Sequence, residues 1–237
     1  MKLGIKFAGM AMVASLSMAA PALADSIVFD TSNLNVPYTL NYNGFSSGTT
    51  IDGLSAATTF TLTGISGNTY TFDYSVTNTS GTPITDSRVG GFAFNADPTI
   101  SSATSTGAFS YTTLNKTYPN AIGTVDVCFK DASTGSCAGS GSGGLTLGQT
   151  GTGSFTLTFS SPVSALTLSD FYVRYQSISG AGNITSASGS GTLTSSTSGG
   201  TPVPEPGMLG LMAGGLVALG MMRRRRGITA RFSPAMA

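Results

Sequence analysis

Short runs that alternate apolar side chains with threonine and serine are the feature that most limits the fold of this 237-residue chain. Residues 69–77, TYTFDYSVT, place an aromatic or aliphatic side chain at every second position. A period of two is typical of a strand with one buried face. Between the two ends of the chain, no segment spaces its apolar residues as a helix does for three turns. The pattern therefore predicts an all-β fold.

The same pattern recurs along the chain between turn-forming segments. It predicts strands at residues 26–30, 37–42, 58–64, 69–77, 89–95, 123–130, 154–160, 165–178 and 183–195. The segment ISGN between the third and fourth runs predicts an antiparallel hairpin. About eight or nine strands in one domain predict two packed antiparallel sheets, as in a β-sandwich or a jelly roll. We expect this domain to span residues 25–195.

The N-terminal segment, residues 1–24, has the composition of a secretory signal peptide. Lys2 and Lys6 precede an apolar stretch, and Ala22 and Ala24 form the small-x-small pattern that a signal peptidase recognises. The alternative is an uncleaved membrane anchor, but the apolar stretch is shorter than the roughly 20 residues that span a bilayer. We expect cleavage after Ala24.

The charge of the body excludes several kinds of partner. Residues 25–200 contain nine aspartates but four lysines and arginines in total, so this part of the chain is acidic. Nucleic-acid phosphates need basic side chains to neutralise them, so we expect no nucleic-acid partner.

Catalysis is limited by the absence of histidine from the whole sequence. Ser-His-Asp and Cys-His nucleophiles and His-ligated metals are excluded. We expect no enzymatic activity and no cofactor.

The remaining acidic alternative is a hydrolase that uses paired aspartates, or aspartates that hold calcium. Single aspartates near turns are more often caps or solvated charges. No D-x-D-x-D-G calcium loop occurs in the sequence. The candidates are Asp73, Asp86, Asp97, Asp126, Asp131 and Asp170.

The two cysteines, Cys128 and Cys137, flank a Ser/Gly turn and lie nine positions apart. In an exported chain this arrangement predicts a disulfide that closes a loop. Loop closure of this length contributes about 2 to 3 kcal/mol. The alternative, a reactive or metal-binding thiol pair, lacks C-x-x-C spacing and further ligands.

The C-terminal part changes character after residue 195. Residues 196–206 form a Ser/Gly/Thr/Pro spacer, and residues 207–222 are 16 residues without a charge, about 24 Å long as a helix. Such a helix can reach across a bilayer with local thinning, and clustered arginines remain on the cytoplasmic side. We therefore expect residues 227–237 in the cytoplasm and the body outside it. The arginine cluster consists of Arg223, Arg224, Arg225 and Arg226.

The three parts of this tail in fixed order resemble the PEP-CTERM sorting signal of Gram-negative bacteria, also described as the C-terminal motif of ice-binding proteins. The motif residues are Val203, Pro204, Glu205 and Pro206. The resemblance implies recognition by an exosortase, cleavage near Pro-Glu-Pro, and transfer of the body to the cell surface or the exopolysaccharide matrix. Residues 125–178 are similar to the cistern family of such proteins, and this likeness implies no biochemical activity.

Two roles for the body follow as hypotheses. The first is a non-catalytic structural or adhesive role at the surface. The alternative is a module that binds a glycan or ice. A glycan site would use exposed tyrosines as stacking platforms, and the candidates are Tyr42, Tyr111, Tyr118, Tyr172 and Tyr175. An ice-binding site would use a regular threonine array, and the candidates are Thr59, Thr61 and Thr63.

Overall fold

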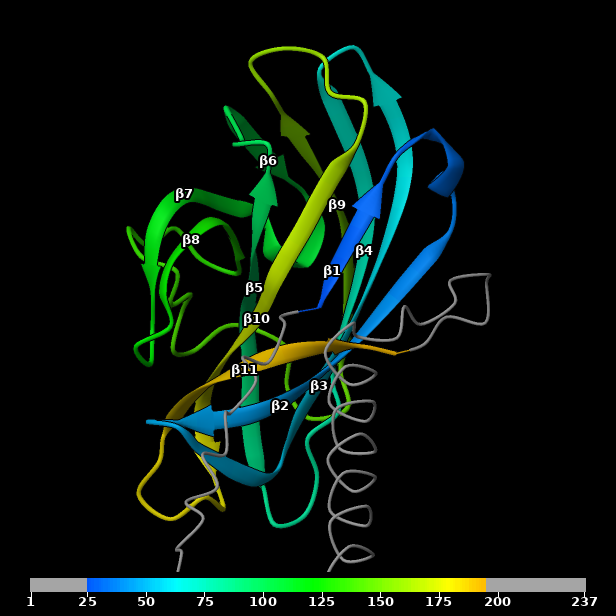
Figure 1. Ribbon diagram of the computed structural model, residues 1–237. Helices are drawn as coiled ribbons and strands as arrows, with labels where there is room; N and C mark the ends of the chain where they lie inside the picture. Colours follow the sequence, from blue (N-terminus) through cyan, green and yellow to red (C-terminus); the bar gives the residue numbers. More distant parts are fainter. Residues whose placement is uncertain (1–24, 195–237) are drawn as a thin grey trace, which may run out of the picture. The chain divides into compact units, whose positions relative to one another are not determined.

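A computed structural model describes residues 25–194 of the chain, which form an all-β structure (Figure 1). This observation confirms the all-β prediction. In this part of the chain, none of the helical segments has the length and apolar character that crossing a membrane requires. The predicted signal peptide at residues 1–24 and the predicted spacer, helix, arginine cluster and tail at residues 196–237 lie outside the described residues.

The strands follow one another with two short 3-10 helices between them. In chain order the strands are β1 (Ser26–Phe29), β2 (Pro37–Ser46), β3 (Thr49–Ser66), β4 (Thr69–Asn78), β5 (Asp86–Asp97), β6 (Ser102–Ser105), β7 (Tyr111–Tyr118), β8 (Gly123–Lys130), β9 (Thr150–Thr158), β10 (Leu166–Ser179) and β11 (Ser186–Leu193). The 3-10 helices are η1 (Thr31–Asn33) and η2 (Gly107–Phe109).

All these strands belong to one antiparallel sheet. Its order is β6-β9-β4-β3-β2-β11-β10-β5-β8-β7, and β1 pairs with β10 beside this path. The two outermost strands, β6 and β7, follow each other in the chain through η2. The sheet therefore curls back on itself and is nearly closed into a barrel.

The structure has one continuous sheet where the sequence pattern predicts two packed sheets. The physical reason lies in the longest strands, which bend. The pairing register shifts between Leu62 and Gly64 in β3, and between Ser169 and Tyr172 in β10. Such bulges bend a strand and increase its twist, so a single strand can continue from one wall of the molecule into the next. The alternation of residues within one strand does not show whether that strand continues from one wall of the molecule into the next.

The hairpin predicted around ISGN is confirmed, because β3 and β4 pair antiparallel across that turn. Strands β6 and β7, and the first part of β3 from Thr49, were not predicted. The β6 sequence SATS and the β7 sequence YTTLNKTY carry polar side chains on both faces. Both strands lie at the ends of the sheet, where a strand buries little surface, so the alternation that marks a half-buried strand is weak.

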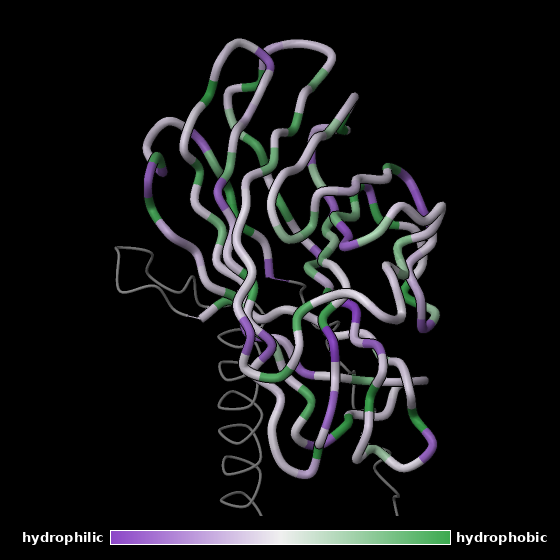
Figure 2. Tube along the Cα trace, turned by 180° about the vertical axis from the view of Figure 1, so that it is seen from behind, coloured by the Kyte–Doolittle hydropathy of each residue, from purple (hydrophilic) through white to green (hydrophobic). Residues whose placement is uncertain are grey.

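The core lies between the facing walls of the curled sheet and is rich in aromatic rings. Phe155 of β9 has its ring centroid 4.9 Å from that of Phe72 in β4 and 4.8 Å from that of Phe129 in β8. Phe60 of β3 packs against Phe155 at 5.9 Å. Strands distant in the sheet order therefore meet through these side chains. Along the strands, green hydrophobic positions alternate with pale ones (Figure 2).

A second, smaller hydrophobic cluster lies on the opposite face of β5, β8 and β10. Phe92 and Phe94 of β5 belong to the main core, whereas Ala93 between them belongs to the second cluster. Consecutive strand residues point to opposite faces, so the second cluster lies outside the barrel. Its buried members are Ala93, Tyr118, Val125, Cys128 and Cys137. The β7–β8 hairpin and the segment after it thus form an additional outer layer.

Candidate functional site

A surface of hydroxyl side chains extends over the outward side of the neighbouring strands β3, β4, β9 and β6. In β4 the odd-numbered residues face outward while every even-numbered residue from 70 to 78 is buried. Strands β3 and β9 alternate in the same way. We call this surface the hydroxyl face. It consists of Thr59, Thr61, Thr69, Thr71, Ser75, Thr77, Ser102, Thr104, Thr150, Thr152, Ser154, Thr156 and Thr158, with Thr39 of β2 beside it.

The pairing register aligns these side chains in rows across the strands. Ser75 lies opposite Thr59 on one side and Thr152 on the other. Thr156 lies opposite both Thr71 and Thr104. Neighbouring strands lie about 4.8 Å apart, and successive outward residues of one strand lie about 6.7 Å apart. The arrangement is a two-dimensional array rather than a single line.

Hydrogen bonds between hydroxyls fix the side chains within the rows. The pairs are Thr39–Thr59 at 2.9 Å, Thr77–Thr150 at 2.8 Å and Thr104–Thr156 at 2.6 Å. Thr106, which directly follows β6, bonds to Ser154 of the face at 2.9 Å. Threonine already has few rotamers because it is branched at Cβ. Each hydroxyl in a pair retains capacity to bond a further partner. The face is thus ordered before any ligand arrives.

The predicted threonine array is therefore part of a larger one. Thr59 and Thr61 belong to the hydroxyl face, whereas Thr63 lies at the β3 bulge and donates to the carbonyl oxygen of Thr71 at 3.2 Å. Sequence reasoning did not connect residues 69–77 and 150–158 with this array. The alternating threonines of both segments were visible, but their neighbourhood depends on the strand order.

The rows of the hydroxyl face contain one charged side chain, the exposed carboxylate of Asp73 between Thr61 and Ser154. The predicted tyrosine platforms lie elsewhere. Tyr42, Tyr118 and Tyr175 are buried, Tyr172 packs against the second hydrophobic cluster, and Tyr111 of β7 is 45% exposed. No tyrosine candidate within the described residues belongs to the hydroxyl face.

An open cleft of about 550 Å³ lies where β2, β3 and β11 meet. Asn41 and Asn43 on the outward side of β2 contribute to it, as does Ser55 of β3. The cleft therefore continues the outward side of the sheet beyond the hydroxyl face. Its other lining residues are Tyr42, Thr50, Ile51, Asp52, Gly53, Leu54 and Thr192.

The predicted aspartates occupy separate positions. Asp126 accepts a hydrogen bond from the Ala96 backbone N–H at 2.8 Å, and Asp170 accepts one from the Asn95 side-chain amide at 3.0 Å. Within residues 25–194, no three or more Cys, Asp or Glu side chains gather in a group that could hold a metal ion. Asp73, Asp86 and Asp97 lie on β4 and at the two ends of β5, and Asp131 directly follows β8.

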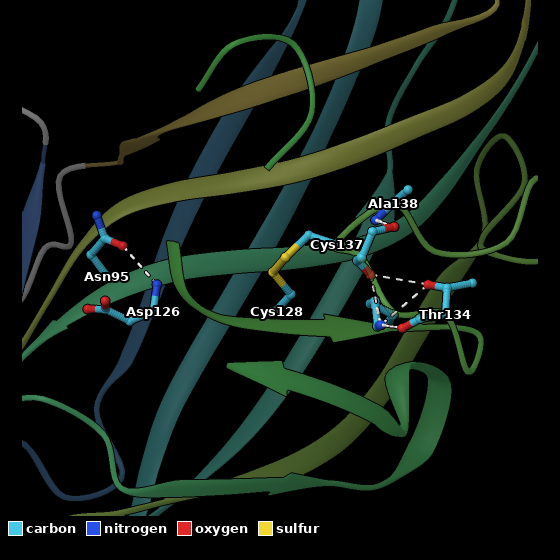
Figure 3. Close-up of a disulfide and its surroundings, with 8 residues drawn as sticks. Asn95, Asp126, Cys128, Thr134, Cys137 and Ala138 are labelled. Carbon is cyan, nitrogen blue, oxygen red and sulfur yellow. Dashed lines mark hydrogen bonds between the residues drawn. A yellow bond between two sulfur atoms is a disulfide. The ribbon is translucent and has the colours of Figure 1, made fainter. Parts of the chain in front are cut away.

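The predicted disulfide is present, with the Cα atoms of Cys128 and Cys137 5.7 Å apart (Figure 3). The loop that it closes surrounds a buried lysine. Lys130 is 1% exposed, and its ammonium group donates hydrogen bonds to the carbonyl oxygens of Thr134 and Ser136, the latter at 2.8 Å. Burial lowers the pKa of Lys130.

Sequence reasoning missed Lys130. The available signal was its position two residues after Cys128 in a strand, which places both side chains on the same face.

Fold and surface together define the body as an all-β protein with an ordered hydroxyl face and a disulfide-closed outer loop. The tail adds a specific assignment, because the PEP-CTERM protein-sorting motif matches residues 202–226. The match includes the predicted Pro-Glu-Pro and arginine cluster and confirms the resemblance. It supports exosortase-dependent C-terminal sorting of an exported protein and implies recognition by an exosortase-type processing enzyme.

Comparisons with curated proteins and with solved structures give no significant match. The matched motif covers residues 202–226 and does not include residues 125–178. The likeness of that segment to the cistern family therefore stays a prediction.

Proposed function

We propose that this chain is a non-catalytic structural or adhesive protein of the cell surface or extracellular matrix of a Gram-negative bacterium. The sorting motif supports the route, and the hydroxyl face supports the role of the body. The observation that carries the proposal is the ordered hydroxyl array on neighbouring strands, because preorganised polar side chains bind a hydrated surface with little loss of entropy.

The proposed route has two further steps. Residues 1–24 direct export and are removed after Ala24. Residues 207–222 then hold the chain in the inner membrane, with the arginine cluster in the cytoplasm, until the exosortase acts near Pro-Glu-Pro. The predicted disulfide supports an oxidising compartment for the body, because disulfides persist outside the cytoplasm. Attachment to exopolysaccharide completes the proposed route.

The composition also supports a binding role for the body rather than a catalytic one. The chain lacks histidine, and the candidate carboxylates of Asp126 and Asp170 bond to neighbouring backbone or amide groups. The outward residues with the most regular spacing carry hydroxyls. Hydroxyls bond to sugars, to water and to polar polymers alike.

Bulky substitutions in the centre of the hydroxyl face test the proposal. Thr71→Tyr and Thr156→Tyr break the rows without touching the core, because both side chains point outward. We expect binding of the purified protein to the extracellular matrix of the producing cells to fall at least about tenfold, equivalent to about 1.4 kcal/mol.

The matched control is Thr117→Tyr, since Thr117 is exposed on β7 outside the face. Equal binding by the control and by the two face variants would contradict the proposal.

The face also favours a second candidate, an ice- or glycan-binding module. A regular threonine array without aromatic platforms supports ice more than a stacked sugar ring, whereas the cleft lined by Asn41, Asn43 and Asp52 supports a sugar. Thermal hysteresis that disappears in Thr71→Tyr would establish ice binding. Selective retention of oligosaccharides on a glycan array would establish the other.

A further inference from the structure

The outer layer of the fold brings oxygen atoms from three distant segments together. Asp131 follows β8, Gln176 belongs to β10, and residues 138–143 lie in the glycine-rich segment after Cys137. Gln176 points to the same side of β10 as Tyr172, which packs against the outer hydrophobic cluster. This place is distinct from the hydroxyl face.

Two of these oxygens are buried acceptors without a donor. Within residues 25–194, the Oδ2 atom of Asp131 and the Oε1 atom of Gln176 are inaccessible to solvent and have no hydrogen-bond partner. The other buried atoms without partners are hydroxyls and one guanidinium nitrogen, which can act as donors. A carboxylate oxygen and an amide oxygen can only accept. Buried atoms of this kind need a positive or protic partner.

The contacts around two glycines show which oxygen atoms lie near one another. A β-carbon built on Gly90 would lie 2.8 Å from Gln176 Oε1 and 3.7 Å from both Asp131 Oδ1 and the carbonyl oxygen of Ala138. A β-carbon on Gly139 would lie 2.6 Å from Asp131 Oδ1 and 2.7 Å from the carbonyl oxygen of Gly90. Oxygen atoms of Asp131, Gln176, Ala138 and Gly90 therefore lie close around these two glycines, where a side chain would not fit.

Two glycines of the loop, Gly139 and Gly143, cannot be replaced by a residue with a side chain without strain. A β-carbon on Gly143 would collide with Asp131 Oδ2, and Gly139 has a φ of 72°, which other residues rarely adopt. The backbone N–H of Ser140 donates to Asp131 Oδ1 at 2.8 Å and fixes the carboxylate in this place. The segment thus wraps closely around one carboxylate.

No basic side chain within the described residues forms an ion pair with this carboxylate, although the charge of the neighbouring Lys130 favours its ionised form. Within the described residues, Lys130 uses its ammonium group to bind Thr134 and Ser136, and Arg174 donates to the carbonyl oxygen of Ala187 at 2.9 Å. Burial raises the pKa of Asp131. A bound cation would remove the cost of the buried charge.

We propose that Asp131, Gln176 and the carbonyl oxygens of Gly90 and Ala138 form a binding site for a calcium ion. Calcium accepts carboxylate, amide and backbone oxygens together with water, in flexible geometry and at 2.3–2.6 Å. Binding therefore requires the segment at residues 138–143 to adjust so that these oxygens reach that distance from one ion. With one carboxylate, the site has the millimolar affinity of extracellular calcium modules.

Calcium titration of the purified full-length chain tests this site. At a concentration about ten times the dissociation constant, calcium raises the melting temperature by about 3 to 6 °C. Magnesium, which demands rigid octahedral geometry, raises it less, and choline chloride at equal ionic strength leaves it unchanged. Absence of a calcium-specific shift up to about 20 mM would overturn the proposal, since a buried water would then satisfy both oxygens.

Two substitutions distinguish a cation from a water or from a direct amide–carboxylate bond. Asp131→Asn retains the shape and removes the charge, so the calcium-dependent shift disappears. Gln176→Glu adds a second carboxylate, so calcium binds about tenfold more tightly while the calcium-free protein melts at a lower temperature. The matched control Asp73→Asn, on the hydroxyl face, retains the shift.

An Asp131→Asn protein that still responds to calcium, or a Gln176→Glu protein that binds no more tightly than the original, would overturn the site. Near-ultraviolet circular dichroism verifies that both variants are folded.

Discussion

At the scale of single residues, three tyrosines have buried hydroxyl groups. Tyr42 is buried and its hydroxyl bonds to that of Thr58 at 2.9 Å. The hydroxyls of Tyr118 and Tyr175 are buried without a partner in the described part of the chain. Burial raises the pKa of all three phenols, because a phenolate cannot be solvated there.

Alkaline pH should therefore unfold the protein in a characteristic way. A phenol whose pKa is raised in the folded state stabilises the fold fully below the ordinary value of about 10, and this stabilisation decreases as the pH rises further. Each buried tyrosine lowers the free energy of unfolding by about 1.4 kcal/mol per pH unit above that value. Chemical denaturation between about pH 8 and pH 11.5 measures the slope.

Tyr118→Phe should reduce that slope by the share of one tyrosine. It should not destabilise the protein at pH 7, because the hydroxyl that it removes has no partner. Tyr42→Phe serves as the comparison and should cost about 1 kcal/mol, since the bond to Thr58 is lost. A cost at Tyr118 equal to that at Tyr42 would contradict this assignment.

At the scale of elements, the disulfide-closed loop combines a predicted and an unpredicted feature. The spacing of Cys128 and Cys137 predicts the loop, because a turn within nine residues can bring the two Cα atoms close enough for a disulfide. The ammonium group of Lys130 then satisfies two loop carbonyl oxygens. Sequence spacing identifies the covalent link but not this internal donor, since a lysine usually remains at the surface.

Removing the disulfide tests how much each feature contributes. Replacing both cysteines with alanine should lower the free energy of unfolding by about 2 to 3 kcal/mol through the entropy of the open chain. Lys130→Met should lower it by a further amount of about 1.5 to 3 kcal/mol, because the carbonyl oxygens of Thr134 and Ser136 lose a charged donor. Thermal and urea denaturation measure both values.

A double-mutant cycle shows whether the contribution of Lys130 depends on the disulfide. If the lysine acts only within the closed loop, its substitution costs less in the cysteine-free protein than in the original, and a double-mutant cycle gives the coupling. Purely additive effects would show that Lys130 organises the loop independently of the disulfide.

At the scale of the whole molecule, the sorting motif and the body make separate contributions. The motif at residues 202–226 supports export and membrane-associated sorting, whereas the hydroxyl face and the outer layer belong to residues 25–194. The acidic excess of aspartates over basic residues in the body disfavours adhesion to nucleic acid or anionic lipid. Hydroxyl contacts are therefore the means of binding that we propose for the body.

Intact mass measurement of the protein from producing cells tests the route. We expect a chain that begins at Asp25 and ends near Pro204–Pro206 when the exosortase is active. Without the exosortase, we expect the C-terminus at Ala237 and retention in the membrane fraction. An unprocessed C-terminus in both strains would show that the tail is a permanent anchor.

The sequence by itself determined which side of the alternating strands, such as β4 and β9, is buried, since a period of two separates the faces without reference to any neighbour. It also determined the disulfide partners and the sorting motif, because both depend on short spacings. Tertiary structure alone decided that β9 lies between β4 and β6, and so that residues 59–61, 69–77 and 150–158 share one array. The same holds for Asp131 and Gln176, whose oxygens both lie near Gly90 because β8 and β10 pair with opposite edges of β5. Strand order arises from pairing between segments far apart in the chain, and a local pattern carries no information on which segments pair.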